Sequence, residues 1–549
     1  MTAPVATVRQ AHPTAARLVW DQVGYAVVAL WRSPTILVFT FALPLVWLVV
    51  IGLLVGNEPV DPASGVRVMQ FVTPVAVAMG TFFATFPTVA TALSEARDSG
   101  VLKRIRGTPL PAWAYLAGQI GAAVLFAAAS IVVTLTVAVL AYGVQIRAQT
   151  ALAMTVTLVV GIAAFSALGL MVAAVSTTAA MAQAISIGGA IVLAFISGMF
   201  VIGGELPAWL TRVASWFPLK PYTDALKAQF DPFLDGAGWD LAALVILMGW
   251  GLAGTLVAAR AFRWQPRAVL GRAPAAAGPG PGNPTTDRPR APGVPRRPSL
   301  PRLLFDRARA ANRSTWRDPG SLLFVVIPVG LYALLLTMQG NVLLPAGLPF
   351  ATFFAASMIT WGAGTAVFMN LPEAVARARD RGVLKRLRGT PLPASHYLAG
   401  VTAAGLALTF LIAGLVVATG FVFFDLRIPV AGLALGVLVI LVGTLTLAAC
   451  GFLLAALVPN ARAVGALGLL FLFVLSFVSD VFIVGGGPAW MSTLGSIFPL
   501  KHLQNALAAA WHPDGPSLDW VNLAVLLAWT AVAGALAVRF FRWEPRGRS

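Results

Sequence analysis

Residues 96–118 read ARDSGVLKRIRGTPLPAWAYLAG, and residues 378–400 read ARDRGVLKRLRGTPLPASHYLAG. The two stretches match at 19 of 23 positions, although they lie in different halves of the chain. Three shorter echoes keep nearly the same offset: Trp31, Arg32 and Pro34 with Trp316, Arg317 and Pro319; FPLK at 217 with FPLK at 498; and FRWQPR at 262 with FRWEPR at 541. Self-similarity at one offset indicates an internal repeat. The sequence therefore predicts two tandem copies of one unit.

The composition places both copies in a membrane. Of the 549 residues, 58% are hydrophobic and only 11% are charged, and the mean hydropathy is +0.84. A net charge of +18 raises the question of a nucleic-acid partner. However, the Arg and Lys residues form short clusters between apolar runs, as loop charges on one membrane face do. We therefore expect a polytopic membrane protein and no nucleic-acid partner.

Apolar runs long enough to span a bilayer recur six times in each half. They cover 35–56, 68–93, 112–142, 150–176, 182–202 and 240–261, and then 320–337, 346–372, 395–423, 430–457, 463–484 and 520–539. Between the halves, residues 271–301 hold nine prolines and five glycines, which is typical of a solvated linker. The sequence predicts an all-α protein with twelve transmembrane helices, built from two six-span halves, 1–270 and 302–549, and a cytoplasmic linker at 271–301.

Loop charges predict which side of the membrane each segment faces. The loops after the second span of each half carry net charges of +2 and +4, whereas the loop with Glu58, Asp61 and Arg67 carries −1. Positively charged loops stay in the cytoplasm, so we expect the repeated segments, the linker and both termini there. An even number of spans gives both halves the same orientation, related by a pseudo-twofold axis along the membrane normal.

The repeated segment predicts a short helix at the membrane surface. Helical spacing after Gly100 separates two faces. The apolar face carries Val101, Leu102 and Ile105, and the basic face carries Lys103, Arg104 and Arg106. Thr108 followed by Pro109 fits the N-cap and first position of the third span. A cytoplasmic charge anchor explains the basic residues alone, but an anchor needs no fixed residue order. The repeated order therefore favours a docking surface.

The order of these motifs resembles a known family. An interfacial helix ending Trp-Arg-Ser-Pro at 31–34 precedes two spans, the repeated basic segment, GELPAWL at 204 and FPLKPYTDAL at 217. This order is similar to that of the ABC-transporter type-2 permeases. Each half resembles one subunit of the daunorubicin-resistance type of exporter permease. The resemblance covers nearly everything except the linker and implies two permease units fused in tandem.

In that family the segment between the second and third spans is a coupling helix that docks on an ATP-hydrolysing subunit. The resemblance gives this role to Glu95, Gly100, Leu102, Lys103, Arg104, Arg106 and Thr108, and to Glu373, Gly382, Leu384, Lys385, Arg386, Arg388 and Thr390. It implies a separate ABC ATPase subunit, in two copies, that holds ATP and Mg. Because Glu95 aligns with Arg377, the second contact is inequivalent unless Glu373 substitutes one turn earlier.

The resemblance also implies an outer gate and a substrate path. The gate, a pair of short helices broken by prolines, falls on Pro207, Trp209, Phe217 and Pro218 and on Trp490, Phe498 and Pro499. An aromatic belt at the interface is the alternative explanation for these residues. The path is lined by the first, second and fifth spans in that family. It falls on Met79, Phe82, Phe86, Met199, Phe200 and Phe368, although helix packing more often explains such stripes.

Several kinds of catalytic site are disfavoured. The chain has no Gly-Lys dipeptide and so lacks the phosphate-binding loop of ATPases. We predict no catalytic residue, no metal site and no cofactor on this chain. The spans nearly lack ionisable residues, which counts against the main alternative, a major-facilitator carrier with six plus six spans driven by an ion gradient. A membrane-embedded transferase, a third interpretation, lacks a convergent cluster of acids, histidines or cysteines.

The sequence prediction is an ATP-driven exporter permease in a bacterial plasma membrane. It moves a hydrophobic or amphipathic compound, antibiotic-like or lipid-like, outward, and its other contacts are membrane lipids. The N-terminal segment carries Arg9 and Arg17 and then an uncleaved first anchor. The identity of the cargo does not follow from the sequence, and export is preferred to import because nothing resembles a dock for a binding protein.

Overall fold

A computed structural model describes residues 14–61, 65–200, 206–262, 309, 319–340, 342–344, 347–389, 394–482, 488–541 and 544. The predicted linker at 271–301 lies outside these residues, as does the second copy of the Trp-Arg pair at 316–317. The described chain is helical apart from one small hairpin, in which β1 (Pro59–Asp61) pairs antiparallel with β2 (Val66–Arg67).

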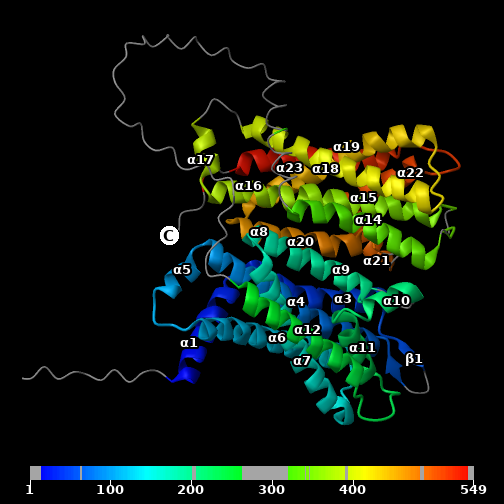
Figure 1. The fold of residues 1–549 in the computed structure, drawn as a ribbon. Coiled ribbons are helices and arrows are strands. Elements are labelled where there is room, and N and C mark those ends of the chain that lie inside the picture. Colours follow the sequence, from blue (N-terminus) through cyan, green and yellow to red (C-terminus); the bar gives the residue numbers. More distant parts are fainter. Residues whose placement is uncertain are drawn as a thin grey trace, which may run out of the picture.

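Helices follow one another in the same order in the two halves (Figure 1). The first half has α1 (Ala15–Trp31), α2 (Pro34–Leu37), the π-helix η1 (Val38–Ala42), α3 (Leu43–Val55), α4 (Met69–Asp98), α5 (Val101–Arg106), α6 (Ala112–Tyr142), α7 (Ala148–Val175), α8 (Ala179–Gln183), η2 (Ala184–Gly188), α9 (Gly189–Ile196), α10 (Ala208–Ala214), α11 (Leu219–Phe230) and α12 (Leu241–Ala261). The second half has α14 (Pro319–Gln339), α15 (Phe350–Ala363), η3 (Gly364–Asn370), α16 (Leu371–Asp380), α17 (Val383–Arg388), α18 (Ala394–Phe423), α19 (Val430–Leu457), α20 (Ala461–Val478), α21 (Ala489–Gly495), α22 (Pro499–Ala510) and α23 (Trp520–Phe540).

The long helices are apolar because a span must satisfy its own backbone hydrogen bonds in lipid. Within the described residues, ten helices are long and apolar enough to cross a membrane. Two shorter apolar helices, Met181–Ile196 and Phe324–Gln339, occupy the predicted fifth span of the first half and first span of the second. Each predicted apolar run is therefore helical, while the number of twelve spans stays a prediction.

The second span of each half is longer than predicted. It continues past 93 to Asp98 in the first half and past 372 to Asp380 in the second. The added residues are too polar to register as an apolar run, yet they remain helical because they pack on the neighbouring spans. These extra turns carry the polar side chains of the site described below.

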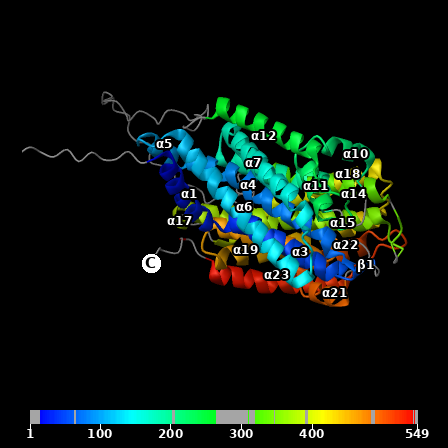
Figure 2. The same ribbon diagram turned by 90° about the horizontal axis from the view of Figure 1, so that it is seen from below.

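The second span lies at the centre of each half. It is almost wholly buried, whereas the third and sixth spans expose most of their surface. In the first half α4 packs on α6 and α7, and in the second half η3 and α16 pack on α19 while α15 packs on α18. Figure 2 shows α12 and α23, the two sixth spans, on opposite flanks of the bundle.

The halves contact each other reciprocally. The fifth span of the second half, α20, packs on α2, η1 and α3, which form the first span of the first half. In return α14, the first span of the second half, packs on α8 and η2, the start of the fifth span of the first half. This exchange agrees with the predicted twofold relation, which itself stays a prediction.

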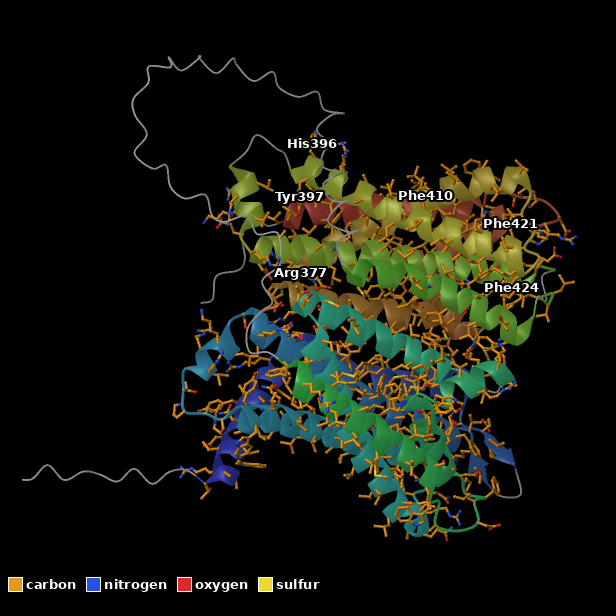
Figure 3. The ribbon with its side chains drawn as sticks, in the orientation of Figure 1. Arg377, His396, Tyr397, Phe410, Phe421 and Phe424 are labelled. Carbon is orange, nitrogen blue, oxygen red and sulfur yellow. The ribbon has the colours of Figure 1, made fainter. Side chains whose placement is uncertain are left out.

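The two repeated basic segments lie at the same end of the bundle, and the short helices α10 and α21 lie toward the other end (Figure 1). Figure 3 shows the length of the bundle along α18, which runs from His396 and Tyr397 near the first end to Phe421 at the second. This arrangement is what two halves in the same orientation require.

Candidate functional site

The repeated basic segments form short helices, as the sequence predicts. α5 and α17 begin directly after Gly100 and Gly382. These glycines have φ angles of 76° and 70°, in the left-handed region that glycine adopts without strain. The turn redirects the chain at the end of the second span. Leu102 and Leu384 then point into the protein and are fully buried.

The opposite face of each short helix is basic and exposed. It carries Lys103, Arg104 and Arg106 on α5, and Lys385, Arg386 and Arg388 on α17. In the second half the Oε1 atom of Glu544 lies 3.9 Å from Lys385 Nζ and 3.7 Å from Arg388 Nη1. These three side chains are about half exposed or more, so each pair contributes at most ~1 kcal/mol. Both helices therefore present a solvated cationic surface.

The prediction that Thr108 caps the third span is wrong. α6 begins at Ala112 and its N-cap is Pro111. The helix cannot begin earlier, because Pro111 disfavours a helical conformation for the residue before it. The hydroxyl of Thr108 instead donates to the carbonyl oxygen of Ile105 at 2.6 Å, which closes the end of α5. Thr390, its counterpart, lies outside the described residues.

The predicted docking acids are engaged within the chain. Glu95 Oε2 accepts a hydrogen bond from Arg462 Nη2 at 2.8 Å, across the boundary between the halves. Glu373 forms an ion pair with Arg377, four residues later on the same helix. Figure 3 marks Arg377 near the end of the bundle that carries α17. Glu95 thus links the halves, while Glu373 neutralises the cation that stands at the aligned position.

A polar cluster in the last turn of α4 was not predicted from the sequence. Arg97 is 4% exposed, and its Nη1 donates to the carbonyl oxygen of Ala173 at 2.8 Å, in the last turn of α7. Asp98 accepts from the backbone N–H of Ala179 at 2.6 Å, at the first residue of α8. Arg97 Nε lies 3.7 Å from Asp98 Oδ1. One dipeptide therefore ties the second span to the fourth and the fifth.

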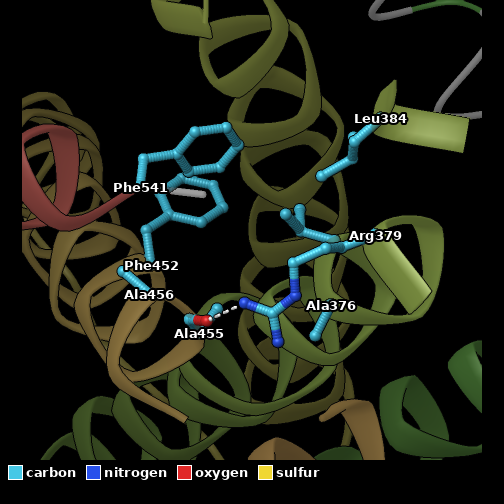
Figure 4. A pocket seen from close by; sticks show the side chains of 8 residues that line it. Ala376, Arg379, Leu384, Phe452, Ala455, Ala456 and Phe541 are labelled. Atoms are coloured by element: carbon cyan, nitrogen blue, oxygen red, sulfur yellow. Dashed lines mark hydrogen bonds between the residues drawn. The ribbon is translucent and has the colours of Figure 1, made fainter. Parts of the chain in front are cut away.

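The second half repeats this cluster. Arg379 donates to the carbonyl oxygen of Ala455 at 2.8 Å (Figure 4), and Asp380 accepts from the N–H of Ala461 at 2.8 Å, at the first residue of α20. Arg379 Nε lies 3.7 Å from Asp380 Oδ1. Its Nη2 also donates to the carbonyl oxygens of Val458 and Pro459, at 2.9 and 3.0 Å. We call Arg97 with Asp98, and Arg379 with Asp380, the Arg–Asp clamps.

A sequence signal for the clamps exists. The Arg-Asp dipeptide is identical in both copies, although the residue after it changes from Ser99 to Arg381. Loop charges near a span are normally explained by membrane topology, which hides any further role. The burial of the arginines separates the two explanations, because a topogenic charge stays in water.

The predicted outer gate consists of two short helices in each half. Pro207 and Pro218 are the N-caps of α10 and α11, so these prolines begin the helices and do not interrupt them. In the second half Pro499 is the first residue of α22. The aromatic gate residues behave differently from one another. Trp209 and Trp490 are about half exposed, Phe217 stacks on Trp250 of α12 with ring centroids 6.0 Å apart, and Phe498 is the N-cap of α22.

Each gate rests on a glycine of the fourth span. A Cβ atom at Gly161 would overlap the ring of Tyr222 on α11, and a Cβ atom at Gly443 would overlap the side chain of Leu503 on α22. The absence of a side chain at these two positions lets the gate helices approach closely, as small residues do between membrane helices. The same seat occurs in both halves.

A buried ion pair distinguishes the second gate from the first. Lys501 on α22 lies 2.8 Å from Asp480, which follows α20, and the two side chains are 11% and 19% exposed. Lys501 also donates to Ser492 Oγ on α21 at 2.7 Å. In the first half the equivalent lysine, Lys220, pairs at 2.7 Å with Asp224 on its own helix. The second gate is thus tied to the fifth span by a charge pair, whereas among the described residues of the first gate the equivalent lysine pairs within its own helix.

The predicted path residues fall into two groups. Met79, Phe82 and Phe86 are buried inside the first half, where Phe82 contacts Phe165 of α7 with centroids 4.9 Å apart. Phe368 is half-buried and packs against the core of the second half. Met199 is 1% exposed, in an apolar cluster that also contains Phe477 and Met491 of the second half. The ring of Phe200 contacts Trp47, which in turn contacts Phe477 of the second half, so Phe200 lies one ring contact from the boundary between the halves.

Phe200 belongs to a chain of aromatic rings that crosses this boundary. Ring centroids are 4.4 Å apart for Phe195 and Phe200, 5.2 Å for Phe200 and Trp47, 5.9 Å for Trp47 and Phe477, 5.5 Å for Phe477 and Phe482, and 5.7 Å for Phe482 and Trp361. We call these six residues the aromatic seam. It joins the first and fifth spans of the first half to the fifth and second spans of the second.

Comparison with known proteins decides the family. A family model described as ABC-2 type transporter matches the chain twice, at residues 23–230 and 305–511. The chain belongs to the ABC-2 type transporter family. No curated protein matches the sequence. The two matches fall on the two repeats, so the chain is an ABC-2 permease with two tandem units.

The assignment agrees with the chemistry of the site. ABC-2 permeases are the membrane subunits of ABC transporters, and they generally pair with ABC ATPase subunits. Within the described residues, no group of three or more His, Cys, Asp and Glu side chains is placed to hold a metal ion. The alternative of a major-facilitator carrier finds no support in the family assignment. The chain is a multi-pass membrane protein of the transport class.

Proposed function

We propose that this permease moves a hydrophobic or amphipathic compound, drug-like or lipid-like, out across a bacterial plasma membrane. ATP hydrolysis by two copies of a separate ABC ATPase subunit supplies the energy, and that partner holds ATP and Mg. The basic segments then face the cytoplasm with both termini, following the distribution of loop charge. The two halves are related by a pseudo-twofold axis that contains the path.

One observation carries this proposal. Two short helices, α5 and α17, stand at the same end of the bundle, each anchored by a fully buried leucine and each exposing three cations. A motor of two subunits needs two docking points on one side of the membrane. Cationic faces suit acidic grooves on such subunits, because complementary charge steers and orients association.

The aromatic seam supports an apolar or amphipathic cargo. Its rings lie where the two halves meet, so a shift between the halves would separate them. The indole N–H of Trp47 is buried and has no hydrogen-bond partner among the described residues. A buried donor without a partner costs about 1–3 kcal/mol, and a polar group of an amphipathic compound would satisfy it. Aromatic faces would hold the apolar part.

Charge reversal on both basic faces tests the proposal. Arg104→Glu combined with Arg386→Glu should release the ATPase subunits, because like charges that meet across an interface cost several kcal/mol. The complex would be purified with an affinity tag on the permease and the ATPase quantified. ATP-dependent movement of ethidium, a lipophilic cation, would be followed in inside-out vesicles. We expect a drop of at least about tenfold in both measurements.

The matched control is Arg427→Glu, which reverses an exposed arginine four residues beyond the end of α18. It should leave association and transport near the native level. Unchanged association in the double variant would reject docking through these helices. Ethidium movement that needs no ATPase and collapses with the proton gradient would reject the ATP-driven mechanism altogether.

A further inference from the structure

We propose that the two Arg–Asp clamps are positioning residues that pass displacement of the coupling helices, α5 and α17, to the fourth and fifth spans. The transmission role rests on the proposed function, whereas the contacts of the clamps do not. The argument uses the place of the clamps in the chain, their chemistry and their repetition.

The clamps lie directly beside the coupling helices. Asp98 stands two residues before Gly100, and Asp380 two residues before Gly382. The buried leucine of each coupling helix lies beside the clamp of its own half. Leu384 lines a cavity of about 10 Å³ together with Arg379 (Figure 4), and Leu102 lies in one apolar cluster with Ala173, the residue that Arg97 contacts. Each coupling helix therefore adjoins its clamp both along the chain and through its buried leucine.

Each charge of a clamp is matched to a helix end. The last carbonyl groups of a helix lack partners within the helix and carry negative partial charge, which a guanidinium group satisfies. The first N–H groups of a helix carry positive partial charge, which a carboxylate satisfies. Arg97 and Arg379 meet the ends of the fourth spans, and Asp98 and Asp380 meet the beginnings of the fifth.

The same construction appears twice in the same register. Each arginine reaches a carbonyl group 76 residues later in its own half, and each aspartate reaches an N–H group 81 residues later. The charges also pair internally at 3.7 Å in both halves. A buried arginine is costly unless it is paired and hydrogen-bonded. The arginine and the aspartate of each clamp therefore depend on each other, unlike solvent-exposed charges in a loop.

The fifth spans carry the movement to the exit. α8 continues through η2 and α9 to Phe200, and α20 ends beside Phe477 and Phe482, so both clamped helices reach the aromatic seam. The fifth spans also make the reciprocal contacts between the halves. Displacement of a coupling helix thus reaches the aromatic seam through the hydrogen bond between the clamp aspartate and the first N–H group of the fifth span, which we call the joint.

Hydrogen exchange on the isolated permease in detergent tests the joint itself. Asp98→Ala with Asp380→Ala removes the acceptors, and the N–H groups of Ala179 and Ala461 should then exchange about tenfold faster, the size expected for a lost N-cap. Asp98→Asn with Asp380→Asn keeps an acceptor oxygen but removes the charge that pairs with each arginine, so its exchange rate should lie between those of the native permease and the alanine pair. Asp425→Ala, an exposed carboxylate elsewhere, is the control. Native exchange rates in the alanine variant would overturn the proposal.

The second measurement separates transmission from a merely structural role. In nanodiscs with the ATPase, the alanine pair should keep the ATPase bound, because the buried leucines and the basic faces are unchanged. Ethidium moved per ATP hydrolysed should fall about tenfold, and the asparagine pair, which keeps the acceptor oxygen but not the charge, should restore part of this ratio. A structural role would lower yield or melting temperature and leave this ratio unchanged, which would overturn the proposal.

Two further outcomes are informative. If the alanine pair does not accumulate, the single variants Asp98→Ala and Asp380→Ala carry the same comparison. Each should speed exchange about tenfold at its own N–H group, Ala179 or Ala461, and leave the other unchanged. Each should lower the transport ratio about threefold, because independent sites contribute additively to the free energy. If the native permease binds no ATPase, the proposed function and the transmission role fail together. The exchange measurement still decides whether the joints exist.

Discussion

Single residues set the two outer gates apart. Asp480 has a φ of 61°, and the aligned residue of the first half is Gly198 with a φ of 71°. A carboxylate therefore occupies a left-handed position where the other copy has glycine, and the conformation is unfavourable for a residue with a side chain. Its ion pair with Lys501 offsets this cost, because both groups are largely buried.

We predict that Asp480→Asn destabilises the permease by about 3 kcal/mol, the usual cost of leaving one member of a buried pair without its partner. Asparagine retains the shape of the side chain and tolerates the left-handed conformation, so the change isolates the charge. The measurement is thermal unfolding in detergent micelles, with tryptophan fluorescence as the signal. Asp480→Asn combined with Lys501→Met should recover most of the loss.

An exposed ion pair provides the comparison for this prediction. Asp425 pairs with Arg427 at 2.9 Å, and both side chains are more than two thirds exposed. Asp425→Asn should change the free energy of unfolding by less than about 1 kcal/mol. Equal effects at Asp480 and Asp425 would contradict the argument from burial.

At this scale, sequence reasoning succeeds where a residue's environment follows from helical spacing. The buried face at Leu102 and the exposed face at Lys103 and Arg104 are such cases. It fails where the partner is distant in the chain. Arg97 finds its acceptor 76 residues away, and no local pattern predicts that contact. Among the path candidates, Phe200 is joined to the second half through Trp47, whose ring contacts Phe477.

Among the elements, the gate helices depend on the fourth spans beneath them. Gly161 and Gly443 occupy equivalent positions in the fourth spans, but they face different side chains of the gate helices. Tyr222 presents a large rigid ring that must move as one body, whereas Leu503 presents a smaller aliphatic group that can change rotamer within less space. The two seats should therefore respond differently to the same added methyl group.

We predict that Gly161→Ala destabilises the permease by about 2 kcal/mol, and Gly443→Ala by about 1 kcal/mol, because overpacking costs more against a rigid neighbour. Thermal unfolding measures both. Gly189→Ala is the control, since no neighbouring side chain and no other segment of the chain lies within 4 Å of its Cβ position, and alanine favours a helix. A larger loss for Gly443→Ala than for Gly161→Ala would contradict the explanation.

Apolar runs predict the elements well and their ends poorly. The third span of the first half and the fourth span of the second match their predicted ranges, 112–142 and 430–457. The second spans run on to Asp98 and Asp380 because packing holds a polar helix together there. The π-helical turns η1, η2 and η3 also escape prediction, since they change the backbone without changing the composition.

At the scale of the whole molecule, the spans themselves make the described contacts between the halves. The first span of each half packs on the fifth span of the other, and the aromatic seam joins them. The ion pair of Glu95 with Arg462 adds a polar contact near the end that carries α5 and α17. Repetition in the sequence predicts two homologous halves. Only the folded chain shows that the first span of each half packs on the fifth span of the other.

We predict that residues 1–270 and 302–549, produced as two chains in one cell, assemble into one complex. An affinity tag on one half should recover the other, because buried aromatic contacts hold the halves together. Trp47→Ala with Phe477→Ala should lower recovery about tenfold or more, since each removed aromatic ring costs about 3–5 kcal/mol when buried.

A variant on the outer surface supplies the comparison for the split permease. Trp520→Ala changes an exposed aromatic residue of α23 and should leave recovery at the native level. Failure of the unmodified halves to associate would show that the linker, and not the seam, holds the molecule together.

The Lys501–Asp480 ion pair at the second gate shows what fusing two copies into one chain permits. An assembly of two identical subunits carries every substitution on both sides of its axis. When both copies are encoded in one polypeptide chain, a substitution can alter one outer gate and leave the other gate unchanged. Asp480 is an example of such a difference, because Gly198 stands at the aligned position of the first copy. A permease of two identical subunits would have the Lys501–Asp480 ion pair at both gates or at neither.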